Sequence, residues 1–183
     1  LEFNSKIIFV NASAMASTYI LLNSKSARFP NGMGNDSGVL GHYLMDHHFS
    51  AGAYGTVEGF DDQYYFGRRP NGFYIPRYRN IGKDKRDYLR GFGYEGGSGR
   101  GWSMPDDDFG IDFKNSASKP GPWNISLSAF AETLPYFENK MWIDESKKDQ
   151  WGMPLANFSA EIGDNEKRMR NDMVNDAAEM LEA

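Results

Sequence analysis

Cysteine is absent from this chain of 183 residues, which excludes disulfide bridges, thiolate metal ligands and a cysteine nucleophile. Histidine is scarce, and the three that occur, His42, His47 and His48, lie in one short segment. A metal site needs a further ligand at suitable spacing, and the neighbours His47 and His48 point to opposite sides of an extended chain. The sequence therefore predicts no metal site and leaves a structural role or proton transfer open for these histidines.

Long apolar runs are also absent. No stretch approaches the roughly 18 apolar residues that a membrane-spanning helix requires, and the first residues do not have the pattern of a secretion signal. Lys and Arg total 20 against 25 Asp and Glu, which gives a formal charge of -5, and adjacent basic residues occur in pairs at most. We therefore expect a soluble chain that binds no nucleic acid and has no membrane-spanning segment.

Aromatic residues are abundant, at 15% of the chain, and they concentrate between Phe49 and Trp151. In that region short aromatic segments alternate with Gly, Pro, Asn and Asp, which is typical of strands and turns. The composition favours sheets, and together with the helices and the resemblance described below we expect an α+β fold with an antiparallel, aromatic-rich sheet flanked by helices. The aromatic side chains either fill the core of this sheet or form a surface that stacks on sugar rings or on a cofactor.

Two helices are predicted, one near each end of the chain. Met15, Tyr19 and Leu22 lie at helical spacing and predict a helix over about residues 14–23. Near the C-terminus an apolar residue recurs every three or four positions, and Asp164 is placed to cap the first turn, which predicts a second helix. The apolar positions of the second helix are Met169, Met173, Ala177 and Met180 or Leu181.

Three segments have strand character. The β-branched run at 6–10 precedes small residues and predicts a strand, a tight turn and then the first helix. Residues 123–129 alternate between apolar and polar with period two, as in a strand that is covered on one face. The run at 140–143 follows a break in this pattern and is a candidate to pair with 123–129 in antiparallel fashion.

Two segments match known motifs only in part. Residues 91–96 fit GxGxxG, which in dinucleotide-binding proteins lets the backbone approach a pyrophosphate at a helix N-terminus. The glycine-rich residues that follow cannot start a stable helix, so we interpret the segment as a flexible transition from strand to loop. The acidic run at 106–108 lacks the loop length and terminal Glu of an EF-hand, and we interpret it as a solvated loop.

The segment from Asn31 to His48, NGMGNDSGVLGHYLMDHH, resembles the passage into the substrate domain of glucose-methanol-choline (GMC) oxidoreductases. The residues in register with the family pattern are Gly41, Leu44, Asp46 and His47. Residues 8–14 and 20–24 are similar to the strand, small-residue turn and helix of the family's FAD domain, with Ser13 where the family often has Gly. Residues 149–154 resemble the family's Asp-x-x-Gly-x-Pro turn.

The resemblance implies an enzyme in which FAD takes a hydride from a CH-OH group while a histidine accepts the hydroxyl proton. It places the catalytic histidine pair beyond Ala183 and the glycine fingerprint before Leu1, so it assigns no catalytic residue to this chain. It assigns to the cofactor side the residues Asn11, Ala12, Ser13, Asp46 and His47.

The expected domain organisation follows from the same resemblance. Residues 1–48 are expected to be the edge of an FAD-binding domain and its junction, and residues 49–183 a substrate-binding domain that continues beyond the chain. The implied branch is that of bacterial sugar or polyol oxidoreductases, in the cytoplasm or the periplasm. Its expected partners are a small alcohol, polyol or sugar and the rest of the FAD domain.

The chain alone is expected to bind no FAD tightly and to show no turnover. Two other classes of protein stay open. One is a non-catalytic β module that binds carbohydrate through its aromatic sheet. The other is a purely structural β domain, which is favoured if the aromatic side chains are all buried.

Overall fold

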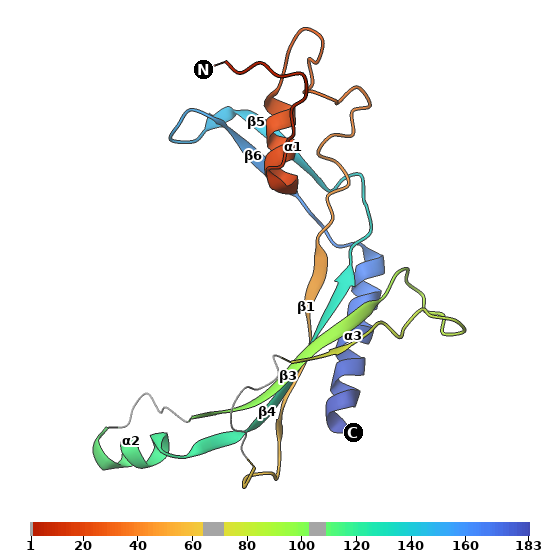
Figure 1. Cartoon of the computed structure of the whole chain (residues 1–183). Helices are drawn as coiled ribbons and strands as arrows, with labels where there is room; N and C mark the ends of the chain where they lie inside the picture. The colour runs from red at the N-terminus through yellow and green to blue at the C-terminus, as the bar shows by residue number, and fades with distance from the viewer. Residues whose placement is uncertain (1, 64–71, 103–108) are drawn as a thin grey trace. The chain divides into compact units, whose positions relative to one another are not determined.

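The computed structural model describes residues 2–63, 72–102 and 109–183 (Figure 1). Its elements in chain order are α1 (Ser13–Asn23), β1 (His47–Val57), β2 (Phe73–Ile75), β3 (Phe92–Trp102), α2 (Gly110–Ala117), β4 (Pro120–Glu132), β5 (Lys140–Lys148), β6 (Pro154–Ser159) and α3 (Asp164–Glu182). The predicted α+β class with an antiparallel sheet is confirmed. None of the helices in the described part of the chain is long and apolar enough to cross a membrane.

The chain forms two compact units. The first contains the residues up to Asp46 together with Leu134–Glu161, and the second contains His47–Thr133 with Ile162–Ala183. The first crossing between the units, after Asp46, lies close to the predicted domain boundary at residue 48. The return of Leu134–Glu161 to the first unit was not predicted, and the assignment of the parts to an FAD domain and a substrate domain stays a prediction.

In the first unit, α1 packs against the hairpin of β5 and β6. The hydroxyl of Tyr19 in α1 donates a hydrogen bond of 2.6 Å to the carbonyl of Pro154. Gly41 lies beside β5: it has a φ of +88°, its carbonyl accepts a hydrogen bond from the Met141 N–H, and a Cβ at this position would clash with the Met141 carbonyl. Both the left-handed backbone and the close approach therefore require glycine at Gly41.

Two strand predictions in this unit need correction. Residues 6–10 form no strand, and Ile7, Ile8 and Phe9 are 68%, 75% and 80% exposed. A strand needs a partner for its backbone hydrogen bonds, and the described residues provide none for this run. The run at 140–143 begins β5 but pairs with β6 rather than with residues 123–129. The short turn stabilised by Asp149, whose carboxylate accepts the backbone N–H of Met153, makes the local hairpin the nearer partner.

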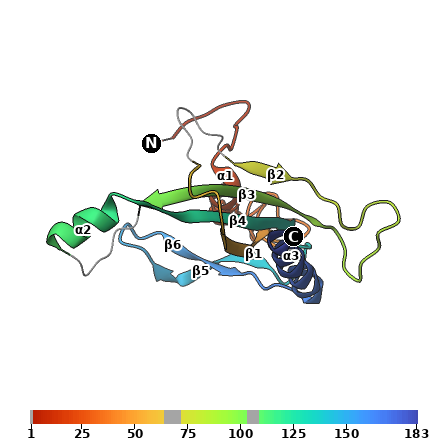
Figure 2. The ribbon, with the colours of Figure 1, turned by 90° about the horizontal axis from the view of Figure 1, so that it is seen from below.

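The second unit is built on a sheet in the order β1-β4-β3-β2, with all neighbours antiparallel. Helix α3 lies beside β1 in both ribbon views (Figures 1 and 2). The helix and the sheet share one core, whose residues below 2% exposure include Phe92, Tyr94, Ala129, Met169 and Met173. The predicted strand at 123–129 is confirmed as the centre of β4.

Helix α3 confirms the second helix predicted from the sequence. Met169, Met173 and Ala177 are fully buried and form the apolar stripe. The predicted cap at Asp164 is wrong, because Asp164 is the first helical residue and Gly163 is the N-cap. The Gly163 N–H donates 2.8 Å to the carboxylate of Glu166, which supplies half of a capping box.

The glycine-rich run at 91–101 is also different from its prediction. It forms most of β3, which pairs with β4 along nearly its whole length, so it is neither a flexible transition nor the start of a helix. Ladder hydrogen bonds to two neighbouring strands outweigh the low strand propensity of glycine. The acidic run at 106–108 lies outside the described residues.

Candidate functional site

Helix α3 packs on one face of the four-stranded sheet and leaves the other face uncovered by a helix in the described part of the chain. Leu127, Ala129 and Ala131 of β4 are buried on the side where α3 packs, while Ser126, Ser128 and Phe130, which alternate with them, are exposed. We call the other side the open face. By strand register it consists of His47, Gly52, Tyr54 and Thr56 of β1, Tyr74 of β2, Gly93, Glu95, Gly97 and Gly99 of β3, and Asn124, Ser126, Ser128, Phe130 and Glu132 of β4.

Strand β3 has glycine at most of its open-face positions. A Cβ at Gly93 would lie 2.8 Å from the Tyr74 hydroxyl, so the Tyr74 side chain extends over Gly93. A Cβ at Gly97 would meet no atom of the other described residues within 4 Å. Glycine in a central strand weakens the sheet, and it is found where a ligand or another backbone comes close. The open space at Gly97 therefore marks a place where a ligand can lie directly on the backbone of the sheet.

Glu95 is the acidic residue beside this glycine surface. In the ladder it lies opposite Tyr74 on one side and Ser128 on the other. Its carboxylate is exposed and makes no hydrogen bond or ion pair with the described part of the chain. A hollow of about 320 Å³ borders it at the β2–β3 pair, lined by Tyr74 and Glu95 of the open face together with Gly72, Phe73 and Gly96. This arrangement offers two acceptor oxygens, a nearby hydroxyl and an aromatic wall to a small ligand.

Hydrogen bonds between side chains of β1 and β4 fix another part of the open face. The Tyr54 hydroxyl donates 2.8 Å to the Asn124 side-chain oxygen, and the Thr56 hydroxyl donates 3.4 Å to the same atom. The ring of Tyr54 is 72% exposed. An exposed aromatic side chain that is fixed by its hydroxyl can stack on a ligand at little entropic cost.

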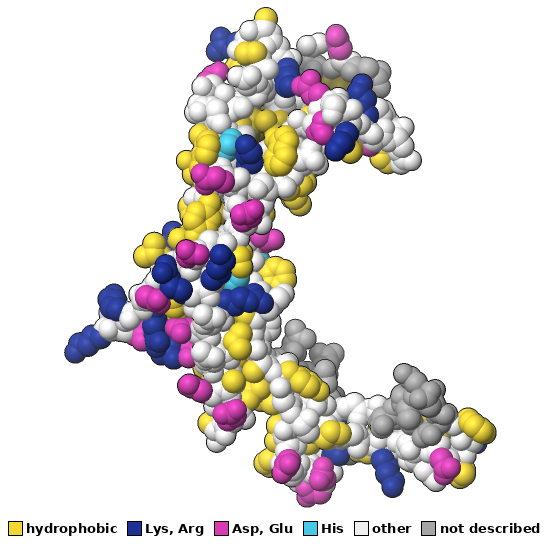
Figure 3. Space-filling model, turned by 180° about the vertical axis from the view of Figure 1, so that it is seen from behind, with side chains coloured by type: hydrophobic (Ala, Val, Ile, Leu, Met, Phe, Trp, Pro, Cys, Tyr) yellow, Lys and Arg dark blue, Asp and Glu magenta, His cyan; other side chains and the backbone are white. Residues whose placement is uncertain are grey.

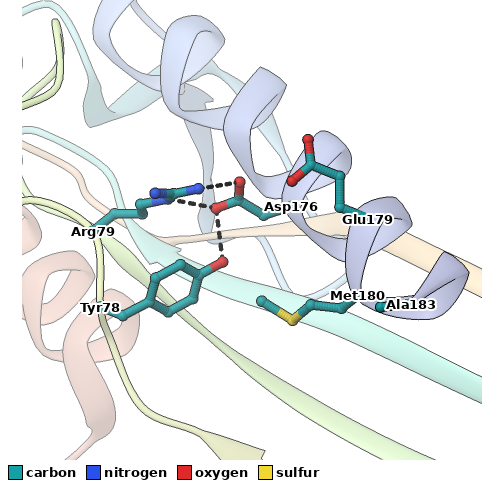
Figure 4. A pocket seen from close by; sticks show the side chains of 6 residues that line it. All are labelled: Tyr78, Arg79, Asp176, Glu179, Met180 and Ala183. Atoms are coloured by element: carbon teal, nitrogen blue, oxygen red, sulfur yellow. Dashed lines mark hydrogen bonds and ion pairs between the residues drawn. The ribbon is translucent and has the colours of Figure 1, made fainter.

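A second hollow, of about 230 Å³, lies between α3 and the loop that joins β2 to β3 (Figure 4). In it Asp176 accepts two hydrogen bonds from Arg79, of 2.7 and 2.5 Å, and one of 2.7 Å from the Tyr78 hydroxyl. Burial opposes ionisation of Asp176, but the bonds from Arg79 and Tyr78 outweigh it and hold the pKa of this carboxyl below its ordinary value. Burial and the bond to Asp176 raise the pKa of Tyr78.

The side chains of Tyr78, Arg79 and Asp176 form hydrogen bonds with one another, which indicates a structural clamp rather than a catalytic site. The same loop makes a further contact to α3, because the Tyr88 hydroxyl donates 2.8 Å to Asp172 and Arg86 pairs with that carboxylate at 3.3 Å. Figure 3 shows Lys, Arg, Asp and Glu side chains interspersed on the surface of this region. Mixed charge of this kind neutralises itself locally and tethers the loop to the helix.

His48 differs from His42 and His47 because its side chain is buried. It lies in β1 on the covered side, 5% exposed, and its Nε2 atom has no hydrogen-bond partner in the described part of the chain. Burial, and then the nearby Arg170 guanidinium, lower the pKa of His48, against an opposing effect of Glu166. A neutral imidazole packed under α3 fits a structural role, which the sequence left open together with proton transfer.

The five residues predicted to lie near a cofactor fall at two places. Asn11, Ala12 and Ser13 lead into α1 in the first unit, and Asp46 and His47 lie on either side of the unit boundary. Ser13 has a φ of +67°, a left-handed conformation that favours glycine. The first turn of α1 has no side-chain cap and no acidic residue. Backbone N–H groups at the first turn of a helix are donors that can bind an anionic group such as a phosphate.

The sequence did not single out Glu95, Ser126, Ser128 or Tyr74. Two patterns in the sequence could have identified these residues. The period-two pattern of 123–129 predicted a strand covered on one face, which makes its serines the uncovered residues. The alternate glycines from Gly93 to Gly99 indicated an unusual strand but were interpreted as a loop.

Comparison with known proteins finds a distant relative. No family model matches the chain. The chain is 26% identical over 202 aligned residues to 2-methyl-1,2-propanediol dehydrogenase of Mycolicibacterium austroafricanum. The alignment covers 100% of this chain but 35% of that protein, so the chain spans about a third of the length of this curated relative. The chain is therefore similar to a segment of a dehydrogenase that is named for a diol.

Proposed function

We propose that the chain is the substrate-binding part of an FAD-dependent oxidoreductase of the GMC type that oxidises CH-OH groups. The observation that supports this most is the one-sided sheet of the second unit. Helix α3 covers one face, while the open face combines glycine backbone, hydroxyl groups and the carboxylate of Glu95, which has no partner among the described residues. Such a surface suits a small hydroxylated substrate, and the similarity to a diol dehydrogenase agrees with it.

In this proposal FAD accepts the hydride when it is bound, and the protein supplies binding and orientation. The residues suited to the cofactor are Asn11, Ala12 and Ser13, because the uncapped start of α1 has N–H groups for an anionic part of it. Asp46 and His47 are the proposed junction close to the cofactor. The base that accepts the hydroxyl proton is expected from the histidine pair that the GMC resemblance places beyond Ala183.

A carbohydrate-binding module without catalytic activity is the second candidate. It is favoured by the exposed aromatic side chains of the sheet, with Tyr54 72% and Tyr74 63% exposed. These exposures also count against a purely structural β domain, for which the aromatic residues would be buried. The two candidates differ in what the isolated chain does, because a module binds sugars alone and a part of an enzyme needs its cofactor domain.

The test compares this chain with the protein encoded by the longer natural reading frame around it. The proposal expects the isolated chain to be colourless and inactive, and the longer protein to have a flavin spectrum and to reduce a dye when an alcohol is added. Calorimetric titration of the isolated chain with a panel of sugars is the control. Tight sugar binding by the chain, with no flavin in the longer protein, would favour the module and refute the enzyme.

A further inference from the structure

Glu95 differs from the other carboxylate on the same side of the sheet. Glu132, which also points to the open face at the end of β4, pairs with Arg90 at 3.3 Å. Glu95 has no such partner in the described part of the chain, although its strand neighbours are Tyr74 and Ser128. The residues that make up the open face include no Lys or Arg. The acceptor oxygens of Glu95 are therefore available to a ligand.

The chemistry of this surface restricts the kind of ligand. An ionised carboxylate is an acceptor with two oxygens, and it can accept one hydrogen bond from each of two neighbouring hydroxyl groups. In the described part of the chain no cation pairs with Glu95, and Arg90 is already paired with Glu132, so an anionic ligand would be repelled. A plain aliphatic alcohol would satisfy one of the two oxygens at most. The hydroxyl of Ser128 beside Glu95 both donates and accepts, which suits a further hydroxyl group.

The shape of the surface agrees with a small, compact ligand. Gly97 lies two residues along β3 from Glu95, and no atom of the described part of the chain lies within 4 Å of the position where its Cβ would be. A ligand bound at Glu95 can therefore extend along the strand in contact with the backbone. Tyr74, whose side chain extends over Gly93, limits this surface at the other end.

We infer that Glu95 binds two adjacent hydroxyl groups of the substrate and so selects vicinal diols, including polyols and sugars, over monoalcohols. This inference rests on the proposed function and names the substrate class of the same site. Glu95 binds and orients the substrate here, while proton and hydride transfer take place at other groups. Hydrogen bonds to a charged group change binding by about 10- to 150-fold, which sets the expected selectivity.

The experiment measures kcat/KM of the full-length natural protein for 1,2-propanediol, 1,3-propanediol and 1-propanol. The variant is Glu95→Gln, which keeps the size of the side chain and removes its charge and one acceptor oxygen. The matched control is Glu132→Gln, on the same face. We expect the wild type to prefer 1,2-propanediol by about 10- to 150-fold, and Glu95→Gln to lose most of this preference through a higher KM for the diol.

Under this inference Glu132→Gln keeps the wild-type preference, and Glu95→Gln oxidises 1-propanol as the wild type does. An equal effect of Glu95→Gln on all three alcohols, or no effect, would overturn the inference. If the full-length protein oxidises no alcohol, the proposed function fails. NMR titration with 1,2-propanediol then tests separately whether Glu95 binds a vicinal diol. Amide shifts near Glu95 and Ser128 that are lost in Glu95→Gln support the site, and the absence of shifts overturns it.

Discussion

Arg79 and Asp176 are joined by two hydrogen bonds, which tie the loop between β2 and β3 to α3. The Asp176 side chain is 8% exposed and the Arg79 side chain 23%, so the pair is largely removed from solvent. Loss of one partner leaves the other charge buried without compensation, and this costs more than an exposed ion pair contributes. The pair is therefore a sensitive point of the second unit.

Replacement of Asp176 tests this relationship. Asp176→Ala is expected to lower the free energy of unfolding by about 3 kcal/mol, because Arg79 and the Tyr78 hydroxyl both lose their acceptor. Urea unfolding followed by circular dichroism measures the change. Glu179→Ala is the control, since Glu179 lines the same hollow and takes no part in the hydrogen bonds of the clamp, and it is expected to change stability by less than about 0.5 kcal/mol. Equal effects of the two substitutions would contradict the clamp.

The buried His48 predicts a dependence of stability on pH. Its pKa is lowered in the folded state from the ordinary 6.5, so the folded protein binds fewer protons than the unfolded chain. This contribution to stability is complete above about pH 6.5 and is lost as the pH falls below it. Urea midpoints between pH 8 and 5 should fall more steeply for the wild type than for His48→Phe. Parallel pH profiles of the two proteins would show that His48 does not contribute.

Backbone strain at Ser13 predicts a gain in stability. The φ of +67° costs a residue with a side chain about 1–2 kcal/mol, which glycine avoids, although glycine also has more freedom in the unfolded chain. We expect Ser13→Gly to raise the free energy of unfolding by up to about 1 kcal/mol. Ala16→Gly, inside α1, is expected to lower it by about 1 kcal/mol. Thermal unfolding of both variants checks the prediction, which fails if they shift the midpoint in the same direction.

The surroundings of Gly93 and Gly97 predict different effects of a Gly→Ala substitution on stability. A Cβ at Gly93 would lie 2.8 Å from the Tyr74 hydroxyl and 2.9 Å from the Ile75 carbonyl, so Gly93→Ala is expected to destabilise the sheet by about 1–3 kcal/mol. Gly97→Ala meets no atom and is expected to leave stability unchanged or to raise it by about 0.5 kcal/mol. Chemical denaturation distinguishes the two variants, and similar losses in both would contradict the open space at Gly97.

Local patterns in the sequence predicted the elements that depend on local spacing. The stripe of Met169, Met173 and Ala177 predicted α3, and the alternation at 123–129 predicted a strand with one covered face. These patterns succeed because periodicity reports directly which side of an element is buried.

Pairing between distant segments could not be predicted in the same way. Residues 6–10 have the composition of a strand but no partner in the described part of the chain, and 140–143 pairs with β6 rather than with β4. The glycine-rich run at 91–101 has poor strand propensity and is nevertheless the strand β3, because neighbours on both sides supply its hydrogen bonds. Glu95 became a candidate only when the register placed it beside Tyr74 and Ser128 on an uncovered face.

The most direct test of the proposed enzyme measures diol-dependent dye reduction by the full-length natural protein and by its Gly97→Leu variant. The account predicts a flavin spectrum in both proteins. It also predicts at least a tenfold lower kcat/KM in the variant, because the leucine fills the space on the open face where the substrate lies. Absence of flavin and of diol oxidation in the wild type, or full activity in Gly97→Leu, would contradict it.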